Sequence, residues 1–175
     1  CAWFQTRKSR RRPLGELFAE TARENWHRLA VADTGGRELT YGRALTGAVA
    51  LAARLKPFTA GQEMAGVCLP PTVAGALVNL ALTLNGTVPV NLNYTASADG
   101  IRSSLDQCGI KVTITYRRFQ EKLGSLPEFP GVLYVEDLLA GLTGGDKCQA
   151  FLKARFLPLR LLAGKAGFSA DQPAT

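Results

Sequence analysis

Polar, uncharged side chains that could bind a ligand follow an apolar segment in the middle of the chain. The stretch LNGTVPVNLNYTAS, residues 84–97, runs through Val-Pro-Val into Asn91, Asn93 and Tyr94. Open α/β sheets bind their ligands beside the carboxyl ends of their strands, so these three residues could contact a substrate. The same side chains could instead bond the backbone, end the strand and lead into a helix capped by Ser97. The sequence favours this second role and leaves the first open.

Two other groups have the residue types of catalysis without its spacing. His27, the only histidine, lies beside an apolar helical stripe with no catalytic partner at a recognisable spacing. We expect it to be a surface residue. Glu136 and Asp137 are adjacent acids whose side chains diverge, which is typical of a helix start rather than of a metal or acid–base pair. We therefore predict no catalytic, cofactor-binding or metal-binding residue in this chain.

The common nucleotide-binding and nucleophile motifs are absent from the sequence. It contains no GxGxxG, no GxxxxGK[ST] and no GxSxG. The Gly-Lys in residues 163–167 lacks the upstream glycine and the following hydroxyl of a phosphate loop. Four scattered cysteines without CxxC spacing are typical of reduced thiols in a cytosolic protein rather than of a zinc site: Cys1, Cys68, Cys108 and Cys148.

The net charge of +7 belongs to the two ends of the chain. Residues 1–12 hold five basic and no acidic residues, and residues 147–165 hold five more basic residues, whereas 13–146 are nearly neutral. A neutral middle weakens a nucleic-acid interpretation, which requires a basic face on the fold itself. The basic run Arg7–Arg12 is typical of a solvated linker, and contact with an anionic membrane surface is the alternative.

An uncharged segment covers residues 64–98 but is too interrupted to span a membrane. Prolines, asparagines and a glycine break it, and its helix-compatible piece, 72–84, falls short of the roughly 20 residues that a bilayer requires. We interpret it as buried core.

Strands and helices alternate along residues 13–146. The apolar pattern predicts strands at 64–69, 87–92, 111–116 and 132–135, and helices at 72–84, 98–107, 118–123 and 136–140. An apolar stripe from Leu14 through Trp26 to Leu29 predicts an earlier helix. A Gly-Gly turn then predicts a β-hairpin over 31–41. A further helix over 42–55 should end at Lys56-Pro57. Such alternation favours an α/β fold with a mainly parallel sheet, helices on both faces, and the first three strands adjacent and parallel.

The organisation expected from composition has three parts. Residues 1–12 form a basic linker, 13–146 an α/β subdomain, and 147–175 a basic connector. Within the connector, Lys153 and Arg160 share a helical face, Arg155 falls opposite and Pro158 breaks the helix. This arrangement makes a poor amphipathic membrane helix.

Several ordered segments resemble the AMP-forming adenylate ligases. LTYGRAL at 39–45 is similar to their first core motif, L-T-Y-x-E-L, although Arg43-Ala44 replaces x-Glu. LTLNGTVPVNLN at 82–93 resembles their second motif. The longer string GVCLPPTVAGALVNLALTLNGTVPVNLNYTAS, with LDQCGIKVTIT after it, is closer to one branch, the acyl–acyl-carrier-protein synthetase/2-acylglycerophosphoethanolamine acyltransferases. The resemblance covers about residues 14–175.

The resemblance implies an N-terminal subdomain of an adenylate-forming enzyme. DQPAT at 171–175 looks like the lead-in to the family's phosphate-binding loop, which would follow. The parent would use ATP and Mg to adenylate a fatty acid, then pass the acyl group to an acyl carrier protein or CoA thiol and on to a lysophospholipid. This chain alone should bind no cofactor, be inactive and self-associate through uncovered apolar surface. Its place would be the cytoplasm, at the inner face of the inner membrane.

Two other classes of function remain open from the sequence. The chain could be a stand-alone, non-catalytic binding or interaction module with the same fold. A weaker option is a nucleic-acid-binding domain that uses the basic ends, which would show a steep salt dependence of its affinity.

Overall fold

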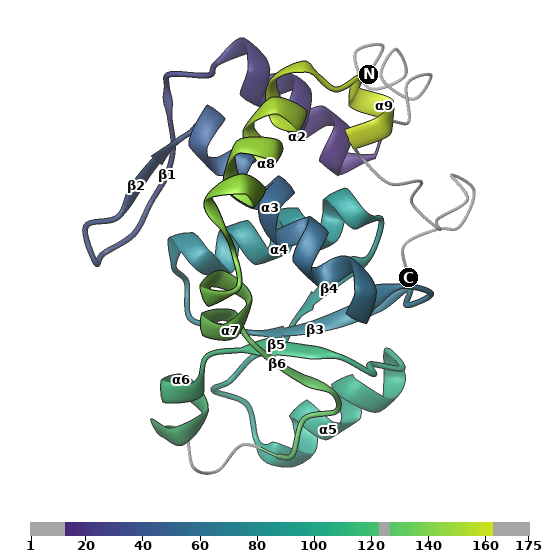
Figure 1. The fold of residues 1–175 in the computed structure, drawn as a ribbon. Helices are drawn as coiled ribbons and strands as arrows, with labels where there is room; N and C mark the ends of the chain where they lie inside the picture. Colours follow the sequence, from purple (N-terminus) through teal and green to yellow (C-terminus); the bar gives the residue numbers. More distant parts are fainter. Residues whose placement is uncertain (1–12, 123–126, 163–175) are drawn as a thin grey trace, which may run out of the picture.

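The computed structural model describes residues 13–122 and 127–162. A four-stranded sheet lies across the molecule, with helices on both of its faces and a two-stranded hairpin to one side (Figure 1). This confirms the α/β architecture. The strands are β1 (Leu29–Ala32), β2 (Glu38–Thr40), β3 (Met64–Cys68), β4 (Val88–Asn91), β5 (Thr113–Thr115) and β6 (Val132–Tyr134). The longer helices are α2 (Leu14–Glu24), α3 (Tyr41–Thr59), α4 (Val73–Asn85), α5 (Ala98–Gln107) and α8 (Gly144–Phe156). The short helices are α6 (Arg117–Lys122), α7 (Val135–Ala140) and α9 (Leu159–Leu162).

The main sheet has the strand order β4-β3-β5-β6, and each neighbouring pair is parallel. Gly66 of β3 stands opposite Val90 on one side and Thr113 on the other. The three strands expected to be adjacent and parallel are therefore so. After β3, helix α4 connects to β4 on one side of β3, and helix α5 then connects to β5 on the other side. The strand order of the sheet therefore reverses between β3 and β5.

Alternate residues of the strands pack into two separate hydrophobic cores, one on each face of the sheet. Ala65, Val67 and Ile114 pack with α3 and α4, in a cluster that also takes residues of α2, α7 and α8. Cys68 belongs to the other cluster, with Leu92 and the buried residues of α5. Because successive side chains of a strand point to opposite faces, a sheet buried on both sides must be apolar almost throughout, as the sequence of β3 is.

Side-chain caps set the helix starts. The hydroxyls of Thr72 and Ser97 accept hydrogen bonds from the N–H groups of Gly75 and Gly100, at 3.3 and 3.2 Å, and so begin α4 and α5. At the other end of α4, Gly86 has φ +80°, the left-handed conformation that ends a helix readily only with glycine. The cap predicted at Ser97 is confirmed.

Two sequence expectations about helix ends are wrong. The helix expected to carry its stripe to Leu29 ends at Glu24, and Leu29 begins β1. The side-chain amide of Asn25 bonds the carbonyl oxygen of Thr21 at 3.0 Å, and the chain turns away there. Conversely, α3 does not end at Pro57 but continues to Thr59. A proline in the last turn costs only one internal hydrogen bond, so the helix tolerates it.

Residue 146, where the subdomain was expected to give way to a connector, lies inside α8. Ala150 and Ala154, one turn apart, are 3% and 0% exposed and join the core beside α3. Arg23 of α2 donates hydrogen bonds to three carbonyl oxygens at the C-terminus of α8, including that of Ala154 at 2.7 Å. The carbonyl oxygens at a helix end lack partners within the helix, and these bonds supply a donor to those of Ala154 and Leu157, while that of Lys153 also accepts from the N–H of Leu157. Helix α8 ends before Pro158, as the sequence indicated.

Strand β4 carries a proline on its outer side. The N–H groups of Val88 and Leu92 bond carbonyl oxygens of the β3 segment, at Glu63 and Val67. Along a strand of a parallel sheet, successive residues direct their backbone N–H groups to opposite sides. Pro89, next to Val88, therefore has its nitrogen on the side away from β3. Within the described part of the chain, no strand pairs with that outer side of β4.

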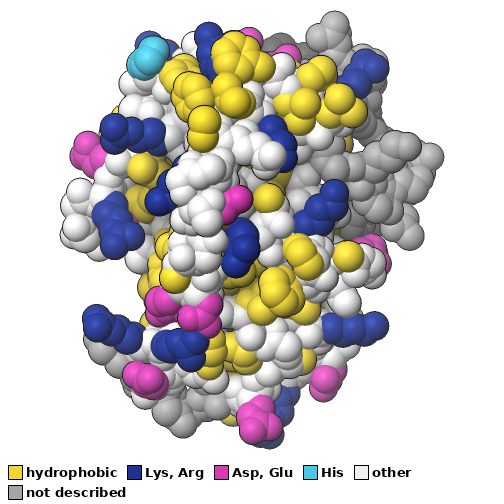
Figure 2. Space-filling view, viewed as in Figure 1, with side chains coloured by type: hydrophobic (Ala, Val, Ile, Leu, Met, Phe, Trp, Pro, Cys, Tyr) yellow, Lys and Arg dark blue, Asp and Glu magenta, His cyan; other side chains and the backbone are white. Residues whose placement is uncertain are grey.

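Large apolar side chains remain on the surface, most of them on α2, α8 and α9. Hydrophobic and basic side chains gather together at the end of the molecule that these helices form (Figure 2). None of the helices described here has both the length and the apolar character that would let it cross a membrane.

Candidate functional site

Two hollows open at the carboxyl edge of the sheet, on either side of the start of α4. One, of about 740 Å³, lies among the hairpin turn, α6 and α7, and its lining includes Asp33, Tyr116 and Glu136. The other, of about 620 Å³, lies beyond the ends of β3 and β4. Thr72, the N-cap of α4, lines both. This edge is where the strand order reverses, the usual place for ligands in open α/β sheets.

The N-terminus of α4 is occupied by a carboxylate of the chain itself. Asp33, at the end of β1, accepts hydrogen bonds from the N–H of Val73 at 3.1 Å, of Gly35 at 2.9 Å and of Arg37 at 3.2 Å. Bonds from Val73 first, and then from Arg37 and Gly35, hold the pKa of Asp33 below its ordinary value, because they stabilise the ionised form. The contact ties the hairpin to the main sheet.

This arrangement does not fit a phosphate group. A helix N-terminus binds anions through its free N–H groups and its dipole. Here Asp33 already uses the N–H of Val73, and its negative charge would repel a second anion. The edge therefore has the shape of a ligand site, but the described residues supply no cradle for phosphate oxygens at α4.

Replacing Asp33 by asparagine is expected to lower the melting temperature at neutral pH. A carboxyl whose pKa is depressed in the folded state adds stability above its unfolded pKa and loses it as pH falls through the folded value. The difference between wild type and Asp33→Asn should thus shrink below about pH 4. Thermal unfolding from pH 7 down to pH 2.5 measures it. Asp106→Asn, on the exposed side of α5, is the control for the loss of a surface charge and should leave the melting temperature at pH 7 close to that of wild type.

Asn91, Asn93 and Tyr94 all line the second hollow. The amides of Asn91 and Asn79 bond each other in both directions, at 2.9 and 3.1 Å, and join β4 to α4. The side-chain oxygen of Asn93 accepts from the N–H and hydroxyl of Thr95, at 3.0 and 2.7 Å. Tyr94 meets the ring of Phe119 edge-on, with centroids 4.9 Å apart. The side chains thus have structural partners while they border the hollow.

The acidic pair at the start of α7 holds the end of β6 to α6. Glu136 accepts the backbone N–H of Arg117 at 3.1 Å, and Asp137 pairs with the Arg117 guanidinium. That guanidinium also lies 4.1 Å from the centroid of the Tyr134 ring. The pKa of Arg117 is raised, chiefly by its bond to Asp137. As expected, both acids stand in the first turn of a helix. The other carboxylate oxygen of Glu136 is buried without a hydrogen-bond partner.

The remaining sequence candidates, His27 and the cysteines that the structure describes, do not line the two hollows. His27 is exposed, in a shallow hollow with Glu24, Arg28 and Arg155. Burial raises the pKa of the Cys68 thiol to about 11, which leaves it protonated and unreactive at neutral pH. In the part of the chain that the structure describes, no three histidine, cysteine or acidic side chains come together in a way that could hold a metal ion.

The sequence did not single out Asp33 as a residue of this edge. It lies 40 positions before Val73, and only the fold brings the two together. The signal available was local: an aspartate before Thr-Gly-Gly is a common turn residue whose carboxylate bonds nearby N–H groups. That pattern predicts the bonds to Gly35 and Arg37, but not the one across to α4.

Residues 18–150 match the family described as AMP-binding enzyme. Among solved structures, the N-terminal subdomain of Klebsiella oxytoca NpsA in complex with 3-hydroxybenzoyl-AMSN has a TM-score of 0.65 and 22% identity, over 75% of this chain and 32% of that one. An artificially fused NpsA–ThdA adenylation-PCP di-domain from the same organism has a TM-score of 0.64 and 22% identity, over 75% and 24%.

A benzoate CoA ligase from Burkholderia xenovorans LB400 is also similar, with a TM-score of 0.61 and 18% identity, over 74% of this chain and 28% of that one. At these identities the likeness concerns the fold. The chain spans about a third of the length of the first of these structures.

Proposed function

We infer that this chain, which belongs to the AMP-binding enzyme family, is the N-terminal part of an ATP-dependent ligase. The ligase would activate a carboxylic acid as its acyl adenylate. The observation that carries this inference is the family match over residues 18–150. The parallel sheet with its reversal between β3 and β5 supports it, because that is the fold shared with adenylation domains.

We propose a fatty acid as the acid that the whole protein activates. The support is the resemblance of residues 66–97 to the acyl–acyl-carrier-protein synthetase branch. The acyl group would pass to a carrier-protein or CoA thiol and then to a lysophospholipid. The NpsA–ThdA fusion of an adenylation domain with a carrier protein is an example of such a thiol partner in a structural neighbour. The competing substrate class is an aromatic acid, because one structural neighbour, NpsA, binds 3-hydroxybenzoyl-AMSN and another is a benzoate CoA ligase.

ATP, with Mg, would be a substrate of the whole protein. The described residues of this chain do not fit its phosphates, because Asp33 occupies the N-terminus of α4. This chain's own contribution would be the wall of the site at the carboxyl edge, where Thr72, Asn91 and Tyr94 border the hollows.

Peripheral attachment at the cytoplasmic face of the inner membrane is part of the same proposal. The basic run Arg7–Arg12 was the sequence candidate for lipid contact, and it lies outside the described residues. Exposed apolar side chains on α2, Leu14 and Leu17, support self-association of the isolated chain. The alternative to an enzyme part is a stand-alone, non-catalytic interaction module with the same fold.

The test is acid-dependent pyrophosphate exchange, measured with a chain extended through its natural downstream sequence. Long-chain fatty acids should support exchange and benzoate should not, because the proposed branch accommodates an acyl chain. Preference for benzoate or anthranilate would contradict the fatty-acid assignment while leaving the ligase intact. If none of the acids tested supports exchange, although circular dichroism shows that the extended chain is folded, the result would favour the interaction module.

A further inference from the structure

We propose that α8 and α9 together form a docking face for an anionic lipid surface. The face, called here the α8–α9 face, combines exposed apolar side chains with basic ones that flank them: Phe151, Leu152, Phe156 and Leu161, with Lys153, Arg155 and Arg160. It is distinct from the run Arg7–Arg12, and it does not depend on which acid the whole protein activates.

The fold of α8 explains why these side chains face outward. Ala150 and Ala154 pack against α3, so Leu152 and Phe156, which are also one turn apart, point away from the core. Leu152 is 50% exposed and Phe156 70% exposed. After Pro158 the chain continues in α9, where Leu161 is again 70% exposed. Helix α9 thus extends an apolar surface that α8 alone would present only weakly.

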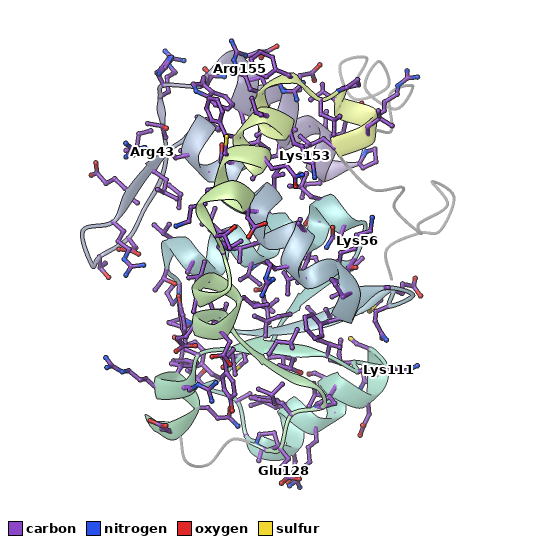
Figure 3. The ribbon with its side chains drawn as sticks, viewed as in Figure 1. Arg43, Lys56, Lys111, Glu128, Lys153 and Arg155 are labelled. Atoms are coloured by element: carbon purple, nitrogen blue, oxygen red, sulfur yellow. The ribbon has the colours of Figure 1, made fainter. Side chains whose placement is uncertain are left out.

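The charges carried by α8 after its first turn and by α9 are all positive, whereas the neighbouring helix α2 carries Glu16, Glu20 and Glu24. Between residues 147 and 162 the chain has four basic residues and no acidic one. Figure 3 shows Lys153 and Arg155 on α8, at the end of the molecule where Figure 2 shows basic side chains interleaved with hydrophobic ones. Glu24 is the acid beside Arg155, in the hollow that also holds Arg28 and His27. The surface is therefore complementary to anionic headgroups.

Aromatic residues on the flank of this face also suit a water–lipid boundary. The ring of Phe151 meets that of Trp26 edge-on, with centroids 5.9 Å apart. The guanidinium of Arg155 lies over the same Trp26 ring, 5.4 Å from its centroid. A half-buried tryptophan next to a cation matches the composition found where one end of a side chain is apolar and the other is wet.

A lipid surface fits this composition better than a protein covering does. Buried protein contacts exclude unpaired cations, because each loses its hydration without gaining a partner. At a membrane, the apolar side chains enter the acyl boundary while the basic ones stay at the headgroups. The two hollows at the carboxyl edge include no residue of α8 or α9, so docking through this face leaves them open.

The experiment measures partition of the 175-residue chain onto vesicles of phosphatidylcholine with and without phosphatidylglycerol. Wild type should bind only the anionic vesicles. The double variant Leu152→Ser, Phe156→Ser should lose about tenfold or more in partition coefficient, because it removes apolar area. Lys153→Gln with Arg160→Gln should lose about tenfold by removing charge. The matched controls are Phe58→Ser, 49% exposed on α3, and Lys56→Gln with Lys111→Gln, both outside the face (Figure 3). They should stay within about twofold of wild type.

A second readout comes from tryptophan fluorescence. In a Trp3→Phe background, Trp26 is the only tryptophan, and brominated anionic lipid should quench it. Quenching should be lost with Leu152→Ser, Phe156→Ser and kept with Phe58→Ser. Far-UV circular dichroism identical to wild type establishes that each variant is folded.

Four outcomes would overturn the assignment. The first is failure of the wild type to bind anionic vesicles, and the second is binding of the α8–α9 variants at the wild-type level. Binding lost only when Arg7–Arg12 are neutralised would place lipid contact on that run. A dimer in sedimentation velocity that Leu152→Ser, Phe156→Ser disperses, with no vesicle binding, would assign the face to a second copy of the chain.

Discussion

Titration of Mg-ATP into the 175-residue chain is expected to give no heat of binding in the micromolar range, and the chain is expected to catalyse no acid-dependent pyrophosphate exchange. Recognition of phosphates requires converging N–H donors from a glycine-rich loop or a free helix N-terminus. At the carboxyl edge, the N-terminus of α4 is already taken by Asp33. Formation of an adenylate also needs fixed positive charge beside the reacting phosphate, and the sequence has no motif that would place it there.

The control for this prediction is the chain extended through its natural downstream sequence, assayed under the same conditions. Activity there, together with silence from the 175 residues, is the expected result. Micromolar affinity for ATP, or exchange that depends on any acid, in the isolated chain would mean that a phosphate site exists among residues 1–175 and was overlooked.

Replacing Gly42 by alanine should destabilise the fold by about 2–3 kcal/mol. Gly42 stands in the first turn of α3, and its N–H bonds the carbonyl oxygen of Trp26 at 2.9 Å. A Cβ at this position would lie 2.4 Å from Cε2 of the Trp26 ring. That ring is held between Phe151 and Arg155, so it cannot move without disturbing α8. Urea unfolding measures the change.

Gly144→Ala is the matched control, because Gly144 is also in the first turn of a helix and an added Cβ would meet no atom within 4 Å. There, alanine should be neutral or stabilise by about 0.5–1 kcal/mol through its lower cost of ordering. Equal stabilities of the two variants would show that Trp26 does not pack on Gly42 as described.

Local signals in the sequence were enough to predict most of the main sheet. Strand β3 is apolar on both faces, Ser97 and Gly86 mark helix ends, and the spacing between strands permits only short crossovers. Together these features fix three adjacent parallel strands, because a parallel pair needs a crossover and a crossover of this length brings neighbours together. The confirmed features are those in which propensity, capping and burial agree.

The features that were missed depend on contacts distant in the chain. Trp26 continues the periodic stripe of α2 by coincidence, and its ring belongs instead against Gly42. Helix α8 faces the core with alanines, which carry too little hydrophobic signal to distinguish a packed helix from a connector. Asp33 at α4 depends on how the hairpin folds back. No local pattern contains these pairings, because tertiary packing decides them.

The place of Pro89 has a consequence for how the chain behaves in a concentrated solution. Among the strands that the structure describes, β4 is at an edge of the sheet, and an edge presents unpaired N–H and C=O groups that can recruit another extended chain, as in amyloid growth. Pro89 removes one donor from that outward row, in the middle of a strand of four residues. An incoming strand would find its ladder interrupted at once. The sheet is thereby protected from templating fibrils along this side, and association across the β4 edge has to use side-chain surfaces instead of backbone pairing.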